Sequence, residues 1–129
     1  MTRFFRLDRI CGDDMSDTAE LIVQRQVEAY NARDVEAFAA CFSDTIEIFD
    51  FPDRLIVSGK PALRERYARR FSESEDLHAE IRGRFSNGTY VVDIEDLTGS
   101  AFGAAPAAVI YEVSRSLITR AWFIRNATI

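Results

Sequence analysis

The stretch from Phe42 to Asp50 carries the residue whose type and spacing best suit chemistry. It reads Phe-Ser-Asp-Thr-Ile-Glu-Ile-Phe-Asp, so Asp50 is two and four residues from Ile48 and Ile46. Strand side chains two apart point to the same face, so Asp50 faces the core if the isoleucines do. Burial disfavours the charged form and raises the pKa, and such an acid is either paired or functional. The alternative is a solvated acid that caps the turn before Pro52.

Two tyrosines and the single histidine are the next candidates. Tyr30 and Tyr67 are expected to be core or pocket-wall aromatics, with proton donation as the alternative. His78 would titrate near neutral pH, but the alternation of its strand places it on a polar face with Arg82 and Arg84. We therefore expect His78 to face solvent or a dimer partner unless a β-bulge intervenes.

Asp93 and Glu95 form a second acidic pair, on one face of a predicted strand and opposite Val92 and Ile94. Alternation predicts that the acids lie outside, or pair across the hairpin with the arginines of the preceding strand. A catalytic role would require the two acids to face inward.

The totals limit the class of protein. With 129 residues, the chain is long enough for one domain with a substantial core. It has 16 basic and 21 acidic residues and a net charge of −5, which argues against a nucleic-acid partner. It also has no apolar run long enough to span a membrane. Cys11 and Cys41 are isolated and His78 is the only histidine, so we expect no metal, reduced thiols and a cytoplasmic location.

Periodicity and breakers predict the elements. Helical spacing begins at Asp17, and Asp34 is the predicted N-cap of a short second helix. A third helix follows Gly59-Lys-Pro and turns Leu63, Tyr67 and Phe71 inward and its arginines mostly outward. The predicted strands cover residues 42–50, 55–57, 77–85, 89–97, 107–113 and 117–124, with a hairpin at Asn87-Gly88.

The resulting order, α-α-β-β-α-β-β-β-β, argues for an α+β domain. We expect a strongly curved, cone-shaped antiparallel or mixed sheet wrapped around the three helices. Residues 16–129 would form this single domain, and residues 1–15 a flexible N-terminal extension.

Several runs of the chain resemble the SnoaL-like, nuclear transport factor 2-like superfamily, which includes the ketosteroid isomerases. They are residues 30–38, the strand to Asp50, Gly59 with the helix after it, and residues 91–95, 110–113 and 121–123. The resemblance implies a cone-shaped fold that often dimerises through the outer face of its sheet. The fold supports many reactions, so it specifies none of them.

Carried over residue by residue, the resemblance places Asp50 at the position of the ketosteroid isomerase general base. The oxyanion-binding tyrosine is replaced by Gln26 and the oxyanion-binding aspartate by Val109, with Tyr30 one helical turn from Gln26. Losing such a donor costs a few kcal/mol of transition-state stabilisation. A true steroid isomerase is therefore not expected.

Two functions remain open. The first is a cofactor-independent enzyme of the isomerase, polyketide cyclase or dehydratase kind, or a hydrolase, with Asp50, Tyr30 and Gln26 as catalytic residues. Its substrate would be a small apolar molecule with one carbonyl or hydroxyl. The second is a non-catalytic ligand-binding or dimerisation module. The expected pocket residues are Val27, Phe38, Ile48, Tyr67, Val109 and Trp122.

Overall fold

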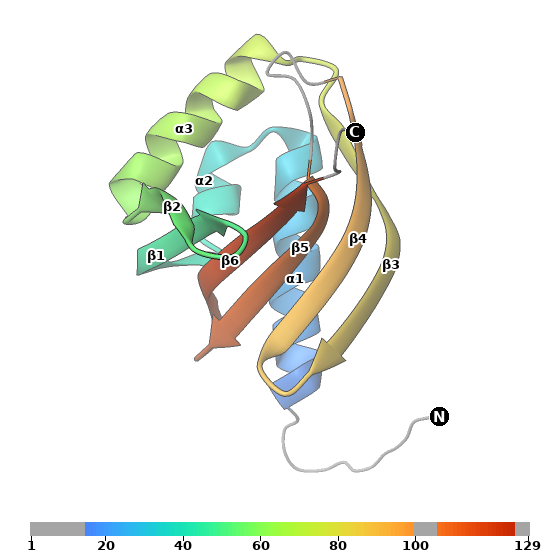
Figure 1. The fold of residues 1–129 in the computed structure, drawn as a ribbon. Coiled ribbons are helices and arrows are strands. Elements are labelled where there is room, and N and C mark those ends of the chain that lie inside the picture. The colour runs from blue at the N-terminus through green and yellow to red at the C-terminus, as the bar shows by residue number, and fades with distance from the viewer. Residues whose placement is uncertain (1–14, 100–105, 126–129) are drawn as a thin grey trace.

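The computed structural model describes residues 15–99 and 106–125. The elements are α1 (Met15–Ala32), α2 (Val35–Ala39), β1 (Phe42–Asp50), β2 (Arg54–Ser58), α3 (Lys60–Glu73), β3 (His78–Asn87), β4 (Tyr90–Thr98), β5 (Pro106–Ser114) and β6 (Leu117–Arg125). Their order confirms the predicted sequence of helices and strands (Figure 1). The expected flexible extension lies almost entirely outside the described residues, as does most of the loop after β4.

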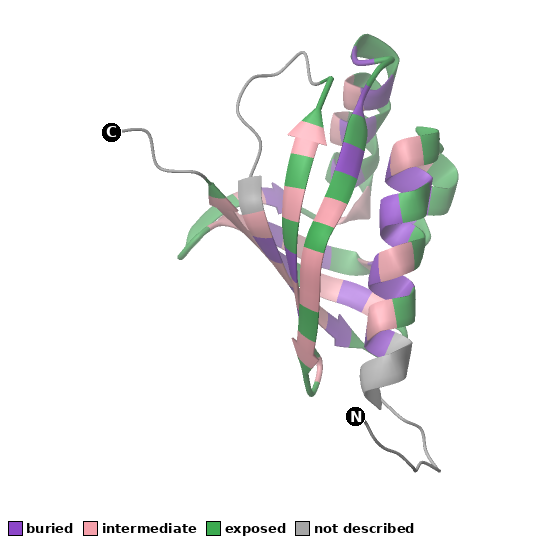
Figure 2. Cartoon of the chain, turned by 90° about the vertical axis from the view of Figure 1, so that its right-hand side faces the viewer, coloured by how far each residue is buried: buried purple, intermediate pink, exposed green. Residues whose placement is uncertain are grey.

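The strands form one open sheet in the order β2-β1-β6-β5-β4-β3. β1 and β6 are parallel, whereas the other neighbouring pairs are antiparallel. The sheet curves around the helices, and the side of α1 that faces it is buried (Figures 1 and 2). This arrangement confirms the predicted cone-shaped α+β fold with a mixed sheet.

Two tight hairpins order the second half of the chain. In the first, Asn87 pairs with Tyr90, so Gly88 and Thr89 form the turn, one residue later than predicted. Gly88 has a φ of +63°, which glycine adopts without steric cost. In the second, Arg115 and Ser116 both have positive φ, as a two-residue turn that matches the twist of its strands requires.

The helices begin where local chemistry favours them. The side chain of Asp34 accepts a hydrogen bond of 3.0 Å from the Ala37 N–H, so Asp34 caps α2 as predicted. α3 follows Gly59 and has proline in its first turn. In α1, Val23 and Val27 are buried, whereas Leu21 is 56% exposed.

A cluster of aromatic rings joins the helices to the sheet. The Phe38 ring centroid lies 4.6 Å from that of Tyr67 and 4.8 Å from that of Phe42. Tyr30 and Phe71 complete the cluster, with their centroids 5.4 Å apart. All five are buried. The cluster packs α2 and α3 against one end of the sheet, and the inward positions predicted for α3 are confirmed.

A bulge in β3 changes which side chains face the helices. Ile81 pairs with Glu95 and Gly83 with Ile94, so Arg82 is the extra residue. Beyond it the parity is reversed, because an extra residue turns every later side chain to the opposite face. The predicted alternation was therefore wrong after Arg82. Arg84 faces the helices, and Phe85 is 61% exposed on the other side.

The predicted inward and outward faces of β4 were wrong over the whole strand. Asp93 is fully buried, whereas Ile94 is 45% exposed, so Asp93 and Glu95 lie on the inner face and not outside. Their inward orientation follows from pairing with β5, where Asp93 is opposite the buried Val109.

Within the described part of the chain, no helix is long and apolar enough to cross a membrane.

Candidate functional site

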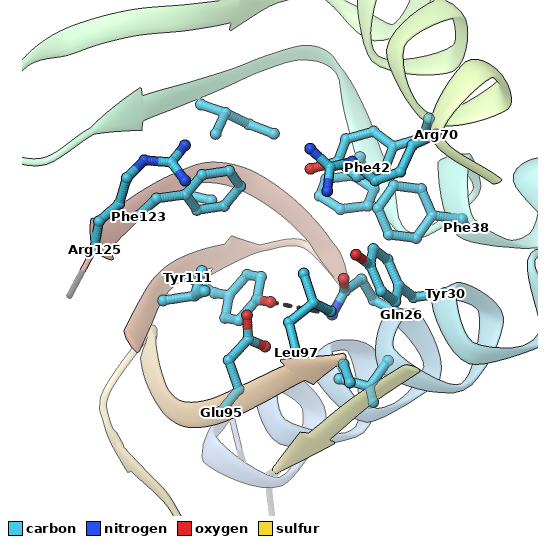
Figure 3. Close-up of a pocket in the computed structure, with 16 residues that line it drawn as sticks. Gln26, Tyr30, Phe38, Phe42, Arg70, Glu95, Leu97, Tyr111, Phe123 and Arg125 are labelled. Carbon is cyan, nitrogen blue, oxygen red and sulfur yellow. Dashed lines mark hydrogen bonds between the residues drawn. The ribbon is translucent and has the colours of Figure 1, made fainter. Parts of the chain in front are cut away.

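A pocket of about 60 Å³ lies between the inner face of the curved sheet and the helices (Figure 3). It contains Gln26, Tyr30 and five of the six residues expected to line a substrate pocket. The described residues that line it are Gln26, Val27, Tyr30, Phe38, Phe42, Ile48, Tyr67, Arg70, Ala79, Glu95, Leu97, Val109, Tyr111, Ala121, Phe123 and Arg125.

Glu95 places a carboxyl group in this pocket from the middle of β4. Its pKa is raised from 4.5 to about 7, mainly by burial and secondarily by the nearby Asp93 carboxylate. A carboxyl with this pKa exchanges its proton readily near neutral pH, as a general acid or base must. The structure thus places the Glu95 carboxyl group, expected outside, inside the pocket.

Tyr111 and Gln26 form a polar pair beside Glu95. The Gln26 amide donates from Nε2 to the Tyr111 hydroxyl oxygen over 3.3 Å, and both side chains are buried. Because the hydroxyl accepts this bond, its own proton stays available for donation. Burial, with Glu95 as the next cause, raises the pKa of Tyr111 well above its usual range. Tyr111 therefore stays protonated as a hydrogen-bond donor.

On the opposite wall, Tyr30 and Tyr67 lie next to Arg70. Burial is the main cause that raises the pKa of both hydroxyls. The Arg70 guanidinium lies over the Tyr67 ring, 5.8 Å from its centroid, and Figure 3 shows it pointing into the pocket. The expectation that the arginines of α3 face outward is thus corrected for Arg70.

Asp50 lies at the rim of the pocket and is not among its lining residues. It pairs in register with Phe123 of β6, so it has the inward parity predicted from Ile48. The strand has by then passed the edge of the core, and the carboxylate is 22% exposed. It accepts hydrogen bonds from Arg125 at 2.9 Å and Arg54 at 3.5 Å. Of the two possibilities, paired or functional, the structure shows Asp50 as a paired acid at the edge of the core.

The expected pocket residue Trp122 lies on the other face of the sheet. Its ring stacks on Phe49, with centroids 5.9 Å apart, and lies 6.4 Å from that of Tyr90. The next residue, Phe123, lines the pocket. Successive strand residues point to opposite faces, so only one of the two faces the cavity, and it is Phe123.

Asp93 does not line the pocket, and its carboxylate forms a buried ion pair instead. Arg84 donates from Nε and Nη2 to its two carboxylate oxygens over 2.6 and 3.0 Å, and also donates to Gln24 on α1 over 2.8 Å. The predicted cross-strand pairing of Asp93 with Arg84 is present, but inside the molecule. It fixes a negative charge close to Glu95.

His78, also a catalytic candidate from the sequence, is exposed at the start of β3 and does not line the pocket. The described residues contain no cluster of three or more histidine, cysteine, aspartate or glutamate side chains able to hold a metal ion. The chemistry of this site is thus that of one carboxyl group, three phenols, an amide and two guanidinium groups.

Sequence reasoning overlooked Tyr111, Arg70 and Arg125 and misplaced Glu95. Alternation alone does not show which face of β4 is inside, because both of its faces carry apolar residues; the register with Val109 of β5 does. No local signal marks the two arginines either, because both lie near the ends of their elements.

Comparison with known proteins supports this fold. Residues 23–121 match the SnoaL-like domain family. No curated protein matches the sequence.

Solved structures align over most of the chain. An uncharacterised cystatin-fold protein of Novosphingobium aromaticivorans is 26% identical (TM-score 0.73, 84% of this chain and 97% of the other). A SnoaL-like protein of unknown function from Burkholderia thailandensis is 16% identical (TM-score 0.71, 86% and 97%). An LEH-like epoxide hydrolase of M. tuberculosis is 12% identical (TM-score 0.67, 88% and 86%).

Proposed function

Because the chain belongs to the SnoaL-like domain family, we propose that it is a small-molecule enzyme that works by acid–base catalysis in its pocket. The reaction class is that of the isomerases, cyclases and dehydratases, in which a proton moves on a carbon beside a carbonyl or hydroxyl group. The observation that carries this proposal is the Glu95 carboxyl, whose pKa of about 7 suits proton transfer at neutral pH.

In this mechanism Glu95 is the general base. Its carboxylate removes a proton from the carbon next to the substrate carbonyl, and the carboxylic acid returns the proton to another atom of the same molecule. The negative charge that develops on the substrate oxygen needs a hydrogen-bond donor. Tyr111, held by Gln26, and Tyr30 on the facing wall are the donors. Asp50 accepts a hydrogen bond from Arg125 at the rim and is assigned no step in this mechanism.

The test is proton exchange on model ketones. The protein is incubated in deuterated water with phenylacetone and with β-tetralone, and NMR follows the loss of signal from the protons beside the carbonyl. Glu95→Gln keeps the size of the side chain and removes the base, so exchange should fall by about 10²–10⁴-fold.

Asp96→Asn is the matched control, since Asp96 is the exposed next residue on β4 and binds Arg82. It should leave the rate unchanged. Full exchange activity in Glu95→Gln would refute the proposed role of Glu95. If Asp50→Asn lowered the exchange rate as much as Glu95→Gln does, Asp50 would be assigned as the general base.

A second proposal concerns the outer face of the sheet. Phe49, Trp122, Ile110, Val92 and Phe85 are paired in register on five adjacent strands. They form an apolar row on the side away from the helices, and Phe85 is 61% exposed. Aromatic side chains are enriched at the centre of protein interfaces. We propose that this row, the outer apolar row, is the interface of a homodimer.

A further inference from the structure

The charged groups around the pocket indicate the chemical class of its ligand. Among the described lining residues, those of charged type are Arg70, Arg125 and Glu95. Glu95 is substantially protonated near neutral pH, because its pKa is about 7. Asp50, at the rim, offsets one of the two guanidinium charges. The described lining residues thus include two guanidinium groups and one carboxyl group, which favours an anionic ligand.

Each of the two guanidinium groups at the pocket lies over an aromatic ring. Arg70 lies over the ring of Tyr67 and Arg125 over the ring of Phe123, with 5.8 and 5.6 Å from each Cζ to the ring centroid. Figure 3 shows both turned toward the interior, one from the α3 side and one from β6. A stacked, planar guanidinium is well suited to bind a carboxylate through two parallel hydrogen bonds.

The other lining residues are suited to contact the hydrophobic part of a ligand. Phe38, Phe42, Ile48 and Val109 are each at most 2% exposed and line the pocket. A pocket that combines apolar walls with a few placed polar groups binds a ligand with both kinds of surface.

We propose that the ligand of this pocket is a small, mainly apolar carboxylic acid, bound as its anion by Arg70 and Arg125. Its hydrophobic part lies among the aromatic rings and its reacting carbon near Glu95. This inference names the substrate class of the proposed enzyme. Only the placement of the reacting carbon near Glu95 rests on the proposed function.

The test compares each acid with its neutral amide, which has nearly the same shape. Phenylacetate, cinnamate and naphthoate, and the three corresponding amides, are titrated into the full chain by calorimetry. A hydrogen bond to a charged group contributes about 1.5–3 kcal/mol, so the acids should bind about ten- to a hundredfold more tightly than the amides. The preference should largely disappear in Arg70→Gln and weaken in Arg125→Gln.

Two further variants make the result decisive. Arg69→Gln removes an exposed arginine beside Arg70 and should leave the preference intact. Glu95→Gln should keep it too, while abolishing proton exchange. Equal binding of acids and amides, no acid binding up to about millimolar concentration, or a preference that survives both Arg70→Gln and Arg125→Gln would overturn this inference. Loss of the exchange result alone would overturn the proposed reaction and leave the ligand class standing.

Discussion

At the scale of single residues, Glu95 is distinguished from the other acids by its surroundings. Asp50 and Asp93 each contact arginine side chains at hydrogen-bonding distance. The dominant influences on Glu95 are burial and a like charge. Both disfavour ionisation, so neighbouring acids of the same chemical type acquire different properties. This contrast is the reason for assigning proton transfer to Glu95 and charge pairing to the two aspartates.

The raised pKa of Glu95 predicts a pH-dependent stability. The unfolded chain releases this proton near the ordinary pKa of 4.5, whereas the folded chain keeps it up to about 7. Between these values the folded state binds more protons, so the free energy of unfolding falls as pH rises through this window. The other groups that interact with Glu95 are Asp93, paired with Arg84, and the tyrosines Tyr30, Tyr67 and Tyr111, which stay protonated there.

Glu95→Gln should remove this slope. At about pH 8 the variant should be more stable than the parent chain by roughly 1–3 kcal/mol, because no charge is buried, and the two should be nearly equal at about pH 4. Urea unfolding at several pH values measures both quantities. If the free energy of unfolding changed with pH in parallel for the parent chain and Glu95→Gln, the raised pKa of Glu95 would be contradicted.

At the scale of elements, the bulge at Arg82 determines what β3 contributes. It turns Arg84 inward to neutralise Asp93, and it turns Phe85 out to the apolar row. Arg82 itself stays exposed and pairs with Asp96 at 3.0 Å. Two arginines two residues apart thus make ion pairs of very different burial.

This difference predicts unequal losses of stability. Arg84→Met should lower the free energy of unfolding by about 3 kcal/mol or more, because it leaves the Asp93 charge buried without its counterion. Arg82→Met should cost less than about 1 kcal/mol, as expected for an exposed pair. Chemical denaturation of both variants gives the comparison.

The double variant of Arg84→Met with Asp93→Leu should recover most of the loss, since no charge then remains buried. A similar small loss in Arg82→Met and Arg84→Met would show that Asp93 is not sealed from water.

At the scale of the whole molecule, the curved sheet has two apolar faces in different surroundings. The inner face packs on the helices and surrounds the pocket, whereas no described helix lies over the outer face (Figure 2). The outer apolar row runs across five strands of this face, with Phe85 exposed and its other four side chains half-buried. Exposed apolar patches of this kind mark interaction sites, and the symmetry of a dimer allows the same row on both partners to pair with itself.

Ile94→Lys should therefore convert a dimer to a monomer. Ile94 lies on the outer face beside this row and is 45% exposed, and a lysine there would bring two like charges together at the interface. Leu21→Lys is the control, because Leu21 is 56% exposed on α1 and away from the sheet. Sedimentation equilibrium measures both. A monomeric parent chain, or a dimer that persists in Ile94→Lys, would contradict the proposed interface.

The sequence by itself determined the order of the elements and most of their limits. Asp34 caps α2, Gly88 supplies the positive φ of a hairpin and helical spacing brings Tyr67 and Phe71 inward. Each of these signals is local, because a cap or a turn depends on residues only a few positions away. They sufficed to predict the α+β fold and several residues that line its pocket.

Only the tertiary structure decided which face of β3 and β4 is inside. In β4 both parities carry apolar residues, since one face surrounds the pocket and the other joins the outer apolar row, so alternation cannot choose between them. The bulge at Arg82 and the register with Val109 make that choice. A shift of one residue exchanges the two faces, and this is why Glu95, expected outside, lies in the pocket.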